Sequence, residues 1–295
     1  MTISQELLFE AKRRYTTPER FKFLLDSGAD INARGNSGRT ALMHAAKCNR
    51  NLDVMKILVD AGSDVSIQDS NGFNALMLAA RNNRNPEVTN FFLSLGLELD
   101  AKNLRGETAL ILAASFNRNP DVVKILLDSG ADINAKCNND FSVLENAALW
   151  NTNPEIVKVL LEAGAVVSER SIRFAASWNG NYKVLELLLG DESVSEKRDE
   201  YLSRRLHEAA CYNKPRVIKF LLDSGANVNE RFYDGQTPLM GAACFGCSKN
   251  VLQLLIESGA DLNAQDNNGK TVIDHARDDK TRKFILDAMN SRLHI

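Results

Sequence analysis

An internal repeat of about 34 residues constrains this chain more than any other feature of its sequence. Pairs of alanines recur along it, with first members at Ala45, Ala79, Ala113, Ala147, Ala175, Ala209 and Ala242. The intervals between these first members are 34, 34, 34, 28, 34 and 33 residues. A glycine that closes a leucine-rich run keeps nearly the same period, at Gly28, Gly62, Gly96, Gly130, Gly164, Gly190, Gly225 and Gly259. Because two residue types share one period, we expect a stack of similar units that contact their neighbours.

Each unit combines a tight turn, a short helix and a longer helix. The turns carry dipeptides such as Asn71-Gly72 and Asp234-Gly235, which accept the positive φ angles of two-residue hairpin turns. In the longer helices, apolar residues recur at helical spacing, as at Val122, Ile125 and Leu126. Stacking buries these stripes against the same stripes of the next unit, so the interfaces between units are expected to stabilise the fold.

The repeated motif resembles the ankyrin repeat. The motif that precedes the first helix in that family occurs here as Gly106-Glu-Thr-Ala-Leu and Gly235-Gln-Thr-Pro-Leu. The motif that follows the second helix occurs as Gly130-Ala-Asp-Ile-Asn. The resemblance covers nearly the whole chain, although most units carry one residue more than the family's usual repeat of about 33. It implies an all-α solenoid of helix-turn-helix pairs joined by β-hairpin fingers, with about nine stacked units including two caps.

We expect one domain over residues 1–295, because a solenoid grows by adding units. The units are assigned as an N-terminal cap (1–34), regular units (35–164), irregular units with a shortened finger (165–205), regular units (206–268) and a C-terminal cap (269–295).

The irregular segment departs from the period in two places. Six residues are missing between Gly164 and Ala175, where a finger is expected, and the chain is predicted to pass directly into the next helix. The next connection, which runs from Gly190 to Ala209, is two residues longer than usual and carries mixed charges in place of a finger motif. We predict an irregular charged connector there. The segment is interpreted either as a binding feature or as a decayed repeat.

Most units carry two asparagines between their helices. The pairs are Asn49/Asn51, Asn83/Asn85, Asn117/Asn119, Asn151/Asn153 and Asn179/Asn181. The first asparagine of each pair is predicted to adopt the left-handed conformation after a helix, and the second to cap the next helix, often before proline. The alternative is that the asparagine rows form a polar strip that binds a ligand.

Composition excludes several classes of protein. The chain has 36 basic and 38 acidic residues, so its total charge does not favour nucleic acid or an anionic membrane as a partner. No apolar run approaches the roughly 20 residues of a membrane span, and no secretory signal is recognisable, so membrane insertion is not expected. The five cysteines lack the spacing of a disulfide framework. We therefore expect a cytoplasmic protein, with secretion by a non-classical route left open.

Catalytic and metal sites are not expected. His44 and His275 are assigned to helix packing, His294 lies in the terminal tail, and His207 beside Glu208 is the candidate base without a partner nucleophile. No phosphate-binding loop or dinucleotide motif occurs, so we predict no enzymatic activity and no cofactor.

A metal site would depend on Cys244 and Cys247, with Cys211 one unit earlier. One C-x-x-C pair is a weak signal for zinc. Gly246 is instead predicted to form the turn after a helix, and Ser248 to cap the next, so no metal is expected.

The resemblance implies that finger tips and the ends of the first helices line a concave groove that binds another protein. When the resemblance is applied position by position, the residues that it implies for the concave face are Lys47, Arg81, Phe116, Leu149, Trp150, Trp178, Tyr212 and Phe245. It selects for the finger tips Asn36, Arg39, Phe73, Arg105, Glu107, Phe141 and Tyr233.

An aromatic residue recurs at one position of five consecutive units: Phe116, Trp150, Trp178, Tyr212 and Phe245, here named the aromatic column. Aromatic anchors dominate many protein interfaces. The structural alternative is that each ring packs over the turn between helices and stacks on its neighbour. We also expect the finger aromatics, such as Phe73, to be exposed.

The predicted function is a non-catalytic scaffold that binds a partner protein or peptide. Basic residues near the N-terminal end of the groove and aromatic residues in its centre suggest a bound segment that is acidic at one end and apolar at the other. Two alternatives remain open: a self-assembling structural or regulatory repeat protein, and an effector of the ankyrin type that interacts with a host.

Overall fold

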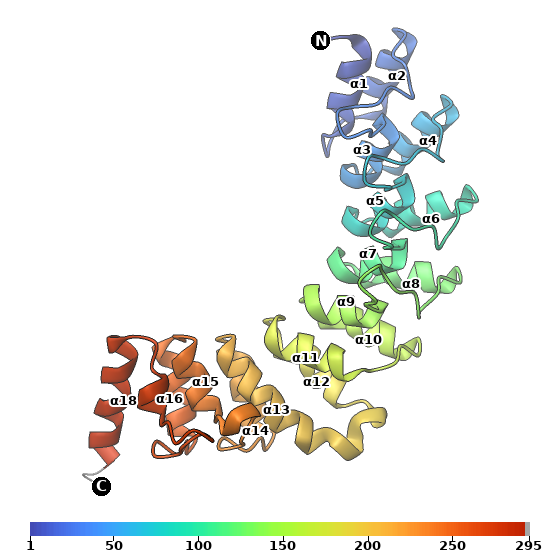
Figure 1. Cartoon of the computed structure of the whole chain (residues 1–295). Coiled ribbons are helices and arrows are strands. Elements are labelled where there is room, and N and C mark those ends of the chain that lie inside the picture. Colours follow the sequence, from blue (N-terminus) through green and yellow to red (C-terminus); the bar gives the residue numbers. More distant parts are fainter. Residues whose placement is uncertain (293–295) are drawn as a thin grey trace. The chain divides into compact units, whose positions relative to one another are not determined.

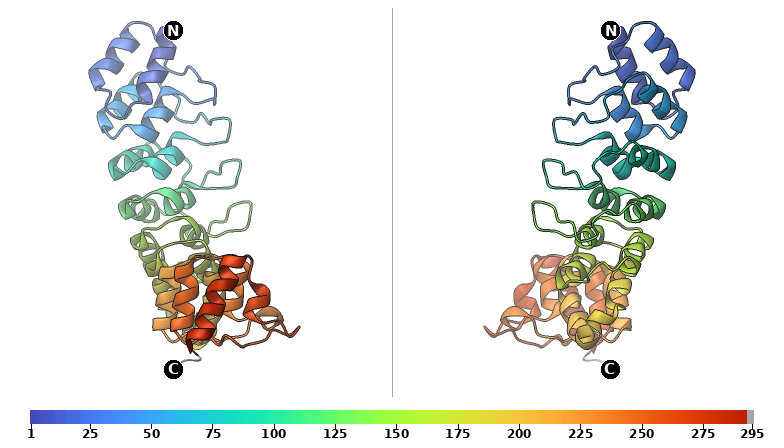
Figure 2. Two further views of the ribbon diagram at one scale, coloured as in Figure 1. Left: turned by 90° about the vertical axis from the view of Figure 1, so that its left-hand side faces the viewer. Right: turned by 90° about the vertical axis from the view of Figure 1, so that its right-hand side faces the viewer.

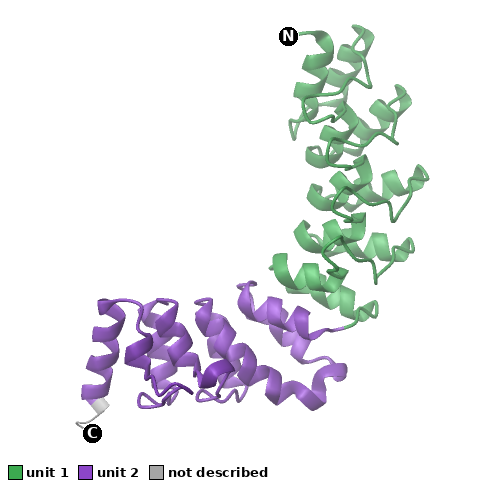
Figure 3. Cartoon of the chain, viewed as in Figure 1, with its two compact units in different colours: residues 1–166 green, residues 167–295 purple. Residues whose placement is uncertain are grey.

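The computed structural model describes residues 1–292 of the chain. The chain forms two compact units: unit 1 spans Met1–Val166 and unit 2 begins at Val167 (Figure 3). Each unit is a stack of paired helices. That the whole chain forms one domain, with the cap and repeat boundaries given above, stays a prediction.

Unit 1 contains five helix pairs (Figure 1). They are α1 (Ile3–Ala11) with α2 (Pro18–Asp26), α3 (Ala41–Cys48) with α4 (Leu52–Asp60), α5 (Ala75–Asn82) with α6 (Pro86–Ser94), α7 (Ala109–Phe116) with α8 (Pro120–Asp128), and α9 (Val143–Trp150) with α10 (Pro154–Glu162). The first helices pack on one another in chain order and form an inner row, and the second helices form an outer row in the same way.

Unit 2 contains four pairs. They are α11 (Glu169–Ser177) with α12 (Tyr182–Leu189), α13 (Arg198–Cys211) with α14 (Pro215–Asp223), α15 (Pro238–Cys244) with α16 (Lys249–Glu257), and α17 (Val272–His275) with α18 (Asp279–Arg292). Two short 3-10 helices, η1 (Glu192–Lys197) and η2 (Tyr233–Gly235), lie in the connections. Nine pairs in residues 1–292 confirm the expected solenoid of about nine units.

In unit 1 the inner helices α3, α5, α7 and α9 are short and mostly buried. In α7 the paired alanines Ala113 and Ala114 and the neighbouring Leu110 have no exposed surface, so the small side chains let adjacent helices approach closely. Thr108 caps this helix, because its hydroxyl accepts a hydrogen bond from the backbone N–H of Ile111 at 3.3 Å. Each fully buried large apolar side chain contributes about 1.5–3 kcal/mol, so the contacts between repeats stabilise the stack.

The loops between pairs project to one side of the helices in unit 1 (Figure 2). They are hairpin-like fingers with little strand character: residues 1–292 contain one isolated bridge, between Lys136 and Ser142. Successive fingers are hydrogen-bonded to one another, with the N–H of Leu104 donating to the carbonyl of Asn71 at 3.0 Å. Gly72 makes this close approach possible, because its φ is +79° and a Cβ there would lie 2.8 Å from the nitrogen of Leu104.

The irregular segment lacks a finger before α11, as the six missing residues suggested. A short link over residues 165–168 leads directly into α11, and the hydroxyl of Ser168 accepts from the N–H of Ser171 at 3.1 Å as the helix cap. The prediction of an irregular connector before Ala209 is wrong, because this stretch folds as η1 and the long helix α13. Burial of Leu202 and Leu206 on one face explains why the charged sequence becomes helical.

Candidate protein-binding surface

A hollow of about 430 Å³ lies in unit 1 between two fingers and the ends of α7 and α9. We name it the aromatic hollow. It is lined by Leu104, Arg105, Glu107, Phe116, Cys137, Asn138, Asn139, Phe141, Asn146, Leu149 and Trp150. Six of the predicted site residues are therefore brought together, from the concave face and from the finger tips. Leu104, a finger residue that is 70% exposed, also lines the hollow.

All five members of the aromatic column are exposed. The exposed fractions are 40% for Phe116, 58% for Trp150, 54% for Trp178, 45% for Tyr212 and 60% for Phe245. Each ring lies at the end of an inner helix or just beyond it, where the helix emerges from the buried stack.

One pair of the column also supports the structural alternative. In unit 2 the ring centroids of Trp178 and Tyr212 are 4.8 Å apart at an interplanar angle of 46°. These rings therefore contact each other across neighbouring repeats while both stay about half exposed. The binding and the structural interpretations of the column remain compatible.

Arg81 is held against the aromatic hollow. Its guanidinium carbon lies 4.5 Å from the ring centroid of Phe116 and 5.9 Å from that of Phe73. Burial lowers the pKa of Arg81, and the nearby carboxylate of Glu107 opposes that shift. The Nε atom of Arg81 is buried without a hydrogen-bond partner. The aromatic contacts thus place a cation beside the rings.

The expectation that Phe73 is exposed is wrong, since it is 8% exposed. Within its finger, the carboxylate of Asp69 accepts hydrogen bonds from the N–H groups of Phe73 and Asn71 and closes the turn, and the guanidinium of Arg81 lies over the Phe73 ring. The guanidinium of Arg39 lies 2.7 Å from the same carboxylate, which is itself buried, so this predicted finger residue already has an ion-pair partner. Tyr233 is 75% exposed, as expected of a finger tip.

The remaining predicted residues differ in exposure. Asn36 and Arg105 are exposed, whereas Lys47, Phe141 and Leu149 are half-buried.

The first asparagine of each pair does not adopt the predicted left-handed conformation. Asn117 is extended (φ −76°, ψ 144°) and 2% exposed. Its side-chain amide donates to the carbonyls of Ala80 and Asn83, each at 2.8 Å, and so joins two repeats. Asn83 and Asn151 make the equivalent bonds to the repeats before them. We name these contacts the asparagine ladder.

The second asparagine confirms the capping prediction. Asn119 accepts a hydrogen bond from the N–H of Asp121 at 3.0 Å and so caps α8. Its amide nitrogen also donates to the carbonyl of Arg84 in the previous repeat, at 2.9 Å. The side-chain amides of Asn117 and Asn119 are both hydrogen-bonded within the protein. The alternative that the asparagines form a ligand-binding strip therefore finds no support at this pair.

The cysteine pair near the C-terminal end has a packing role. The thiol of Cys247 donates to the carbonyl of Ala210 at 3.0 Å, at the place that the first asparagine occupies in unit 1. Burial raises the pKa of Cys211 to about 12 and raises the pKa of Cys247 as well, so these thiols remain protonated at neutral pH. Within residues 1–292, no cluster of three or more His, Cys, Asp or Glu could hold a metal ion.

The predicted turn at Gly246 is confirmed by its φ of +65°. Ser248 stands at the N-cap of α16 as predicted, although its side chain makes no capping hydrogen bond. Its hydroxyl instead donates to the side-chain oxygen of Asn213 at 2.8 Å.

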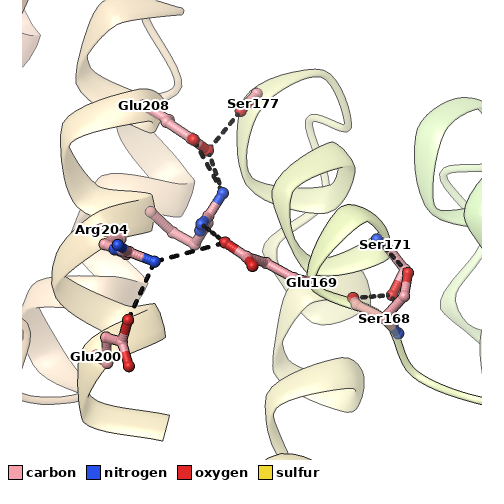
Figure 4. Close-up of polar contacts among 8 residues, drawn as sticks. Ser168, Glu169, Ser171, Ser177, Glu200, Arg204 and Glu208 are labelled. Atoms are coloured by element: carbon pink, nitrogen blue, oxygen red, sulfur yellow. Dashed lines mark hydrogen bonds and ion pairs between the residues drawn. The ribbon is translucent and has the colours of Figure 1, made fainter. Parts of the chain in front are cut away.

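A buried charged network joins α11 and α13 (Figure 4). The guanidinium of Arg205, whose side chain is 3% exposed, lies 2.8 Å from the carboxylate of Glu208 and 3.0 Å from that of Glu169. The hydroxyl of Ser177 donates to Glu208 at 3.2 Å. Burial raises the pKa of Glu208, while Arg205 and Ser177 oppose this shift. The sequence analysis missed this network, whose only sequence signal was the charged stretch that replaces a finger.

The three described histidines lie in different helices: His44 in α3, His207 in α13 and His275 in α17. His207 is 8% exposed, and its ring stacks on Phe232 with centroids 4.7 Å apart. Burial lowers the pKa of His207 to about 4, so its ring is neutral and enclosed at neutral pH. His275 lies 2.9 Å from the carboxylate of Asp266 inside a finger. His294 lies outside the described residues.

A second hollow in unit 1, of about 300 Å³, surrounds the predicted site residue Lys47. We name it the basic hollow. Lys12, Arg14 and Arg50 line it as well, and the sequence analysis did not select these three residues for the site. None of the helices in residues 1–292 combines the length and the apolarity that a membrane crossing requires.

Comparisons with known proteins agree with this architecture. A family model described as ankyrin repeats (3 copies) matches residues 8–103, 76–171, 172–266 and 206–288. The crystal structure of the human ASB11 ankyrin repeat domain is similar, with a TM-score of 0.60 and 25% sequence identity, over 72% of this chain and 96% of that chain. A comparison with curated protein sequences gave no match.

Proposed function

Because the chain belongs to the ankyrin-repeat family, whose members typically bind proteins, we propose that it is a non-catalytic scaffold for a partner protein or peptide. Each unit contributes a binding surface of its own, which consists of its members of the aromatic column and the finger tips that flank them. In unit 1 this surface includes the aromatic hollow, and in unit 2 it includes Trp178, Tyr212, Tyr233 and Phe245.

The observation that carries this proposal is the exposure of the aromatic column. Five large rings at one repeat position are each 40–60% exposed, although α7, which ends at Phe116, buries all of its other seven residues. Exposed aromatic side chains on a rigid framework are typical anchors of protein interfaces, and a preformed surface loses little conformational entropy on binding.

The test is capture of a partner from lysate of the native cell, repeated with the Trp150→Ala/Trp178→Ala variant. We expect the variant to unfold cooperatively and to lose the partner. Phe23→Ala is the matched control, because Phe23 is also 58% exposed but lies on α2, in the outer row. A partner retained by the double variant and lost from the control would contradict the proposed surface, and concentration-dependent dimers without any partner would favour self-assembly.

The proposal also places the protein in a reducing compartment, the cytoplasm, without a metal or nucleic acid as ligand. The five cysteines are free thiols in the structure, and Cys244 is exposed. Alkylation of the protein directly in lysed cells, followed by mass measurement, tests this. Reduced thiols are expected, and a cellular disulfide would contradict the assignment.

A further inference from the structure

The basic hollow concentrates positive charge without a counter-ion. Lys12 and Arg14 follow α1, Lys47 lies in the last turn of α3, and Arg50 lies in the turn before α4. The hollow is lined by these four cations and by three neutral residues, and no acidic residue lines it. Among the ion pairs of residues 1–292, none includes any of the four.

Helix geometry accounts for part of this charge. A cation at the C-terminal end of a helix is stabilised by the helix dipole, which explains Lys12 and Lys47. Arg14 and Arg50 lie outside the helices, so the dipole does not explain them.

The positive field reaches the buried side chain behind the hollow. The pKa of His44 is lowered to about 4, first by burial and then by the charges of Lys12, Arg39 and Lys47. Two of the four cations that line the hollow, Lys12 and Lys47, therefore act on the same buried ring. An anionic group in the hollow would offset these charges.

Arg81 links the basic hollow to the aromatic hollow. Asn82, which follows it at the end of α5, lines the basic hollow. The guanidinium of Arg81 lies over the ring of Phe116, which lines the aromatic hollow. In unit 1, the basic surface thus covers α1 to α5 and the aromatic surface covers α7 and α9.

The spacing of the two hollows sets the length of a ligand. Neighbouring helices pack about 8–10 Å apart, so α3 and the midpoint of α7 and α9 are separated by roughly 20–25 Å. An extended chain rises about 3.3 Å per residue, so about 6–8 residues bridge this distance.

We propose that unit 1 binds an extended protein segment whose acidic residues occupy the basic hollow and whose large apolar side chain, about 6–8 residues away, enters the aromatic hollow. This inference rests on the proposed function and names the chemistry of the partner. Charge complementarity favours acidic side chains, and the rings of Phe116 and Trp150 favour an apolar anchor.

The test is selection of displayed random peptides of about 16 residues on the full-length protein, long enough to span both hollows. The same selection is made on the Lys12→Ser/Arg14→Ser/Arg50→Ser variant. The matched control is Lys56→Ser/Lys124→Ser/Lys158→Ser, which removes the same charge from the outer helices α4, α8 and α10, where each lysine faces a carboxylate.

The expected result is enrichment of acidic residues about 6–8 positions from a large apolar residue, on the unsubstituted protein and on the control. A selected peptide should bind the basic-hollow variant about tenfold more weakly, because three exposed ion pairs are lost. Raising the salt from about 0.1 to about 0.5 M should weaken binding to the unsubstituted protein and have less effect on the variant.

Selected peptides without acidic bias, no enrichment at all, or equal binding by the basic-hollow variant would overturn the inference. Displacement of the peptide by a single-stranded RNA oligonucleotide at lower concentration than by free acidic peptide would also overturn it, in favour of a nucleic acid ligand. Failure of this inference is distinguishable from failure of the proposed function. A cellular partner that is lost with Trp150→Ala/Trp178→Ala and kept by the basic-hollow variant would leave the scaffold function standing.

Discussion

In unit 1, neutral amides join the turns of successive repeats, whereas in unit 2 a charged network joins α11 to α13. The asparagine ladder uses two bonds of 2.8 Å from Asn117 to carbonyls of the preceding repeat. The network places the buried guanidinium of Arg205 between Glu169 and Glu208.

The difference shows how one repeat framework tolerates different chemistry at its interfaces. A neutral amide costs less to bury than a charge, and its bonds can be repeated in every unit. A buried ion is stable only while all its partners are present. Unit 2 lacks the finger before α11, and its network is specific to that place in the chain.

The largest expected loss of stability comes from Arg205→Met, which breaks the charged network. This change leaves the mostly buried carboxylate of Glu208 unpaired, and we expect a loss of about 3–5 kcal/mol in the free energy of unfolding. Urea denaturation measures it.

Arg204→Met is the control, since Arg204 is 41% exposed and pairs with Glu200 and Glu169 at the surface; we expect a loss below about 1 kcal/mol. Equal losses in both variants would show that the network contributes no more than a surface ion pair.

The ladder is tested by Asn117→Ala. It removes two hydrogen bonds to buried carbonyls, and we expect a loss of about 2–3 kcal/mol. Asn119→Ala removes a helix cap and one hydrogen bond near the surface and should cost about 1 kcal/mol. Thermal or urea unfolding compares the two variants. If the order were reversed, capping rather than the ladder would be the main role of the asparagine pairs.

Acid should destabilise both units through their buried histidines. The pKa values of His44 and His207 fall from 6.5 to about 4 in the folded state. The unfolded chain therefore binds more protons below pH 6.5, so stability is full above that pH and falls as the pH decreases toward 4. Each histidine accounts for about 1–3 kcal/mol of this loss.

Unfolding free energies measured across this pH range check the prediction. His44→Gln and His207→Gln should each flatten the profile, the first through unit 1 and the second through unit 2. An unchanged profile in either variant would show that the corresponding ring does not titrate with a lowered pKa.

The smallest expected effects distinguish the two parts of the aromatic column. Trp150→Ala should change stability by less than about 0.5 kcal/mol, because the ring is 58% exposed. Trp178→Ala should cost about 0.5–1.5 kcal/mol more, because its ring packs on Tyr212. Denaturant midpoints measure both. A larger loss of stability from Trp150→Ala than from Trp178→Ala would show that the structural role belongs to the ring in unit 1 and not to the ring in unit 2.

Much of the architecture could be predicted from the sequence because the same sequence pattern recurs in each repeat. The paired alanines, the glycine after each outer helix and the Asn-Gly turns report local requirements for close packing and positive φ. The helix pairs and the exposed aromatic column followed from these local signals.

The errors arose where specific hydrogen bonds and burial override local preference. An asparagine after a helix often takes the left-handed conformation, but Asn117 gains two bonds by remaining extended and reaching the preceding repeat. Phe73 lies at a finger position, yet its ring is buried beneath the guanidinium of Arg81, and its N–H is bound by Asp69. The mixed charges before Ala209 suggested an irregular connector, but the buried leucines on one face made it helical.

The sequence by itself determined the family and the approximate number of repeats, because these depend on periodic local patterns. Only the tertiary structure decided which of the predicted site residues are accessible and which charges meet. Lys12, Arg14, Lys47 and Arg50 are separated by up to 38 positions in sequence and share one hollow because stacking aligns equivalent ends of successive helices. Local patterns do not encode such proximity, since each side chain is placed by the packing of a neighbouring repeat.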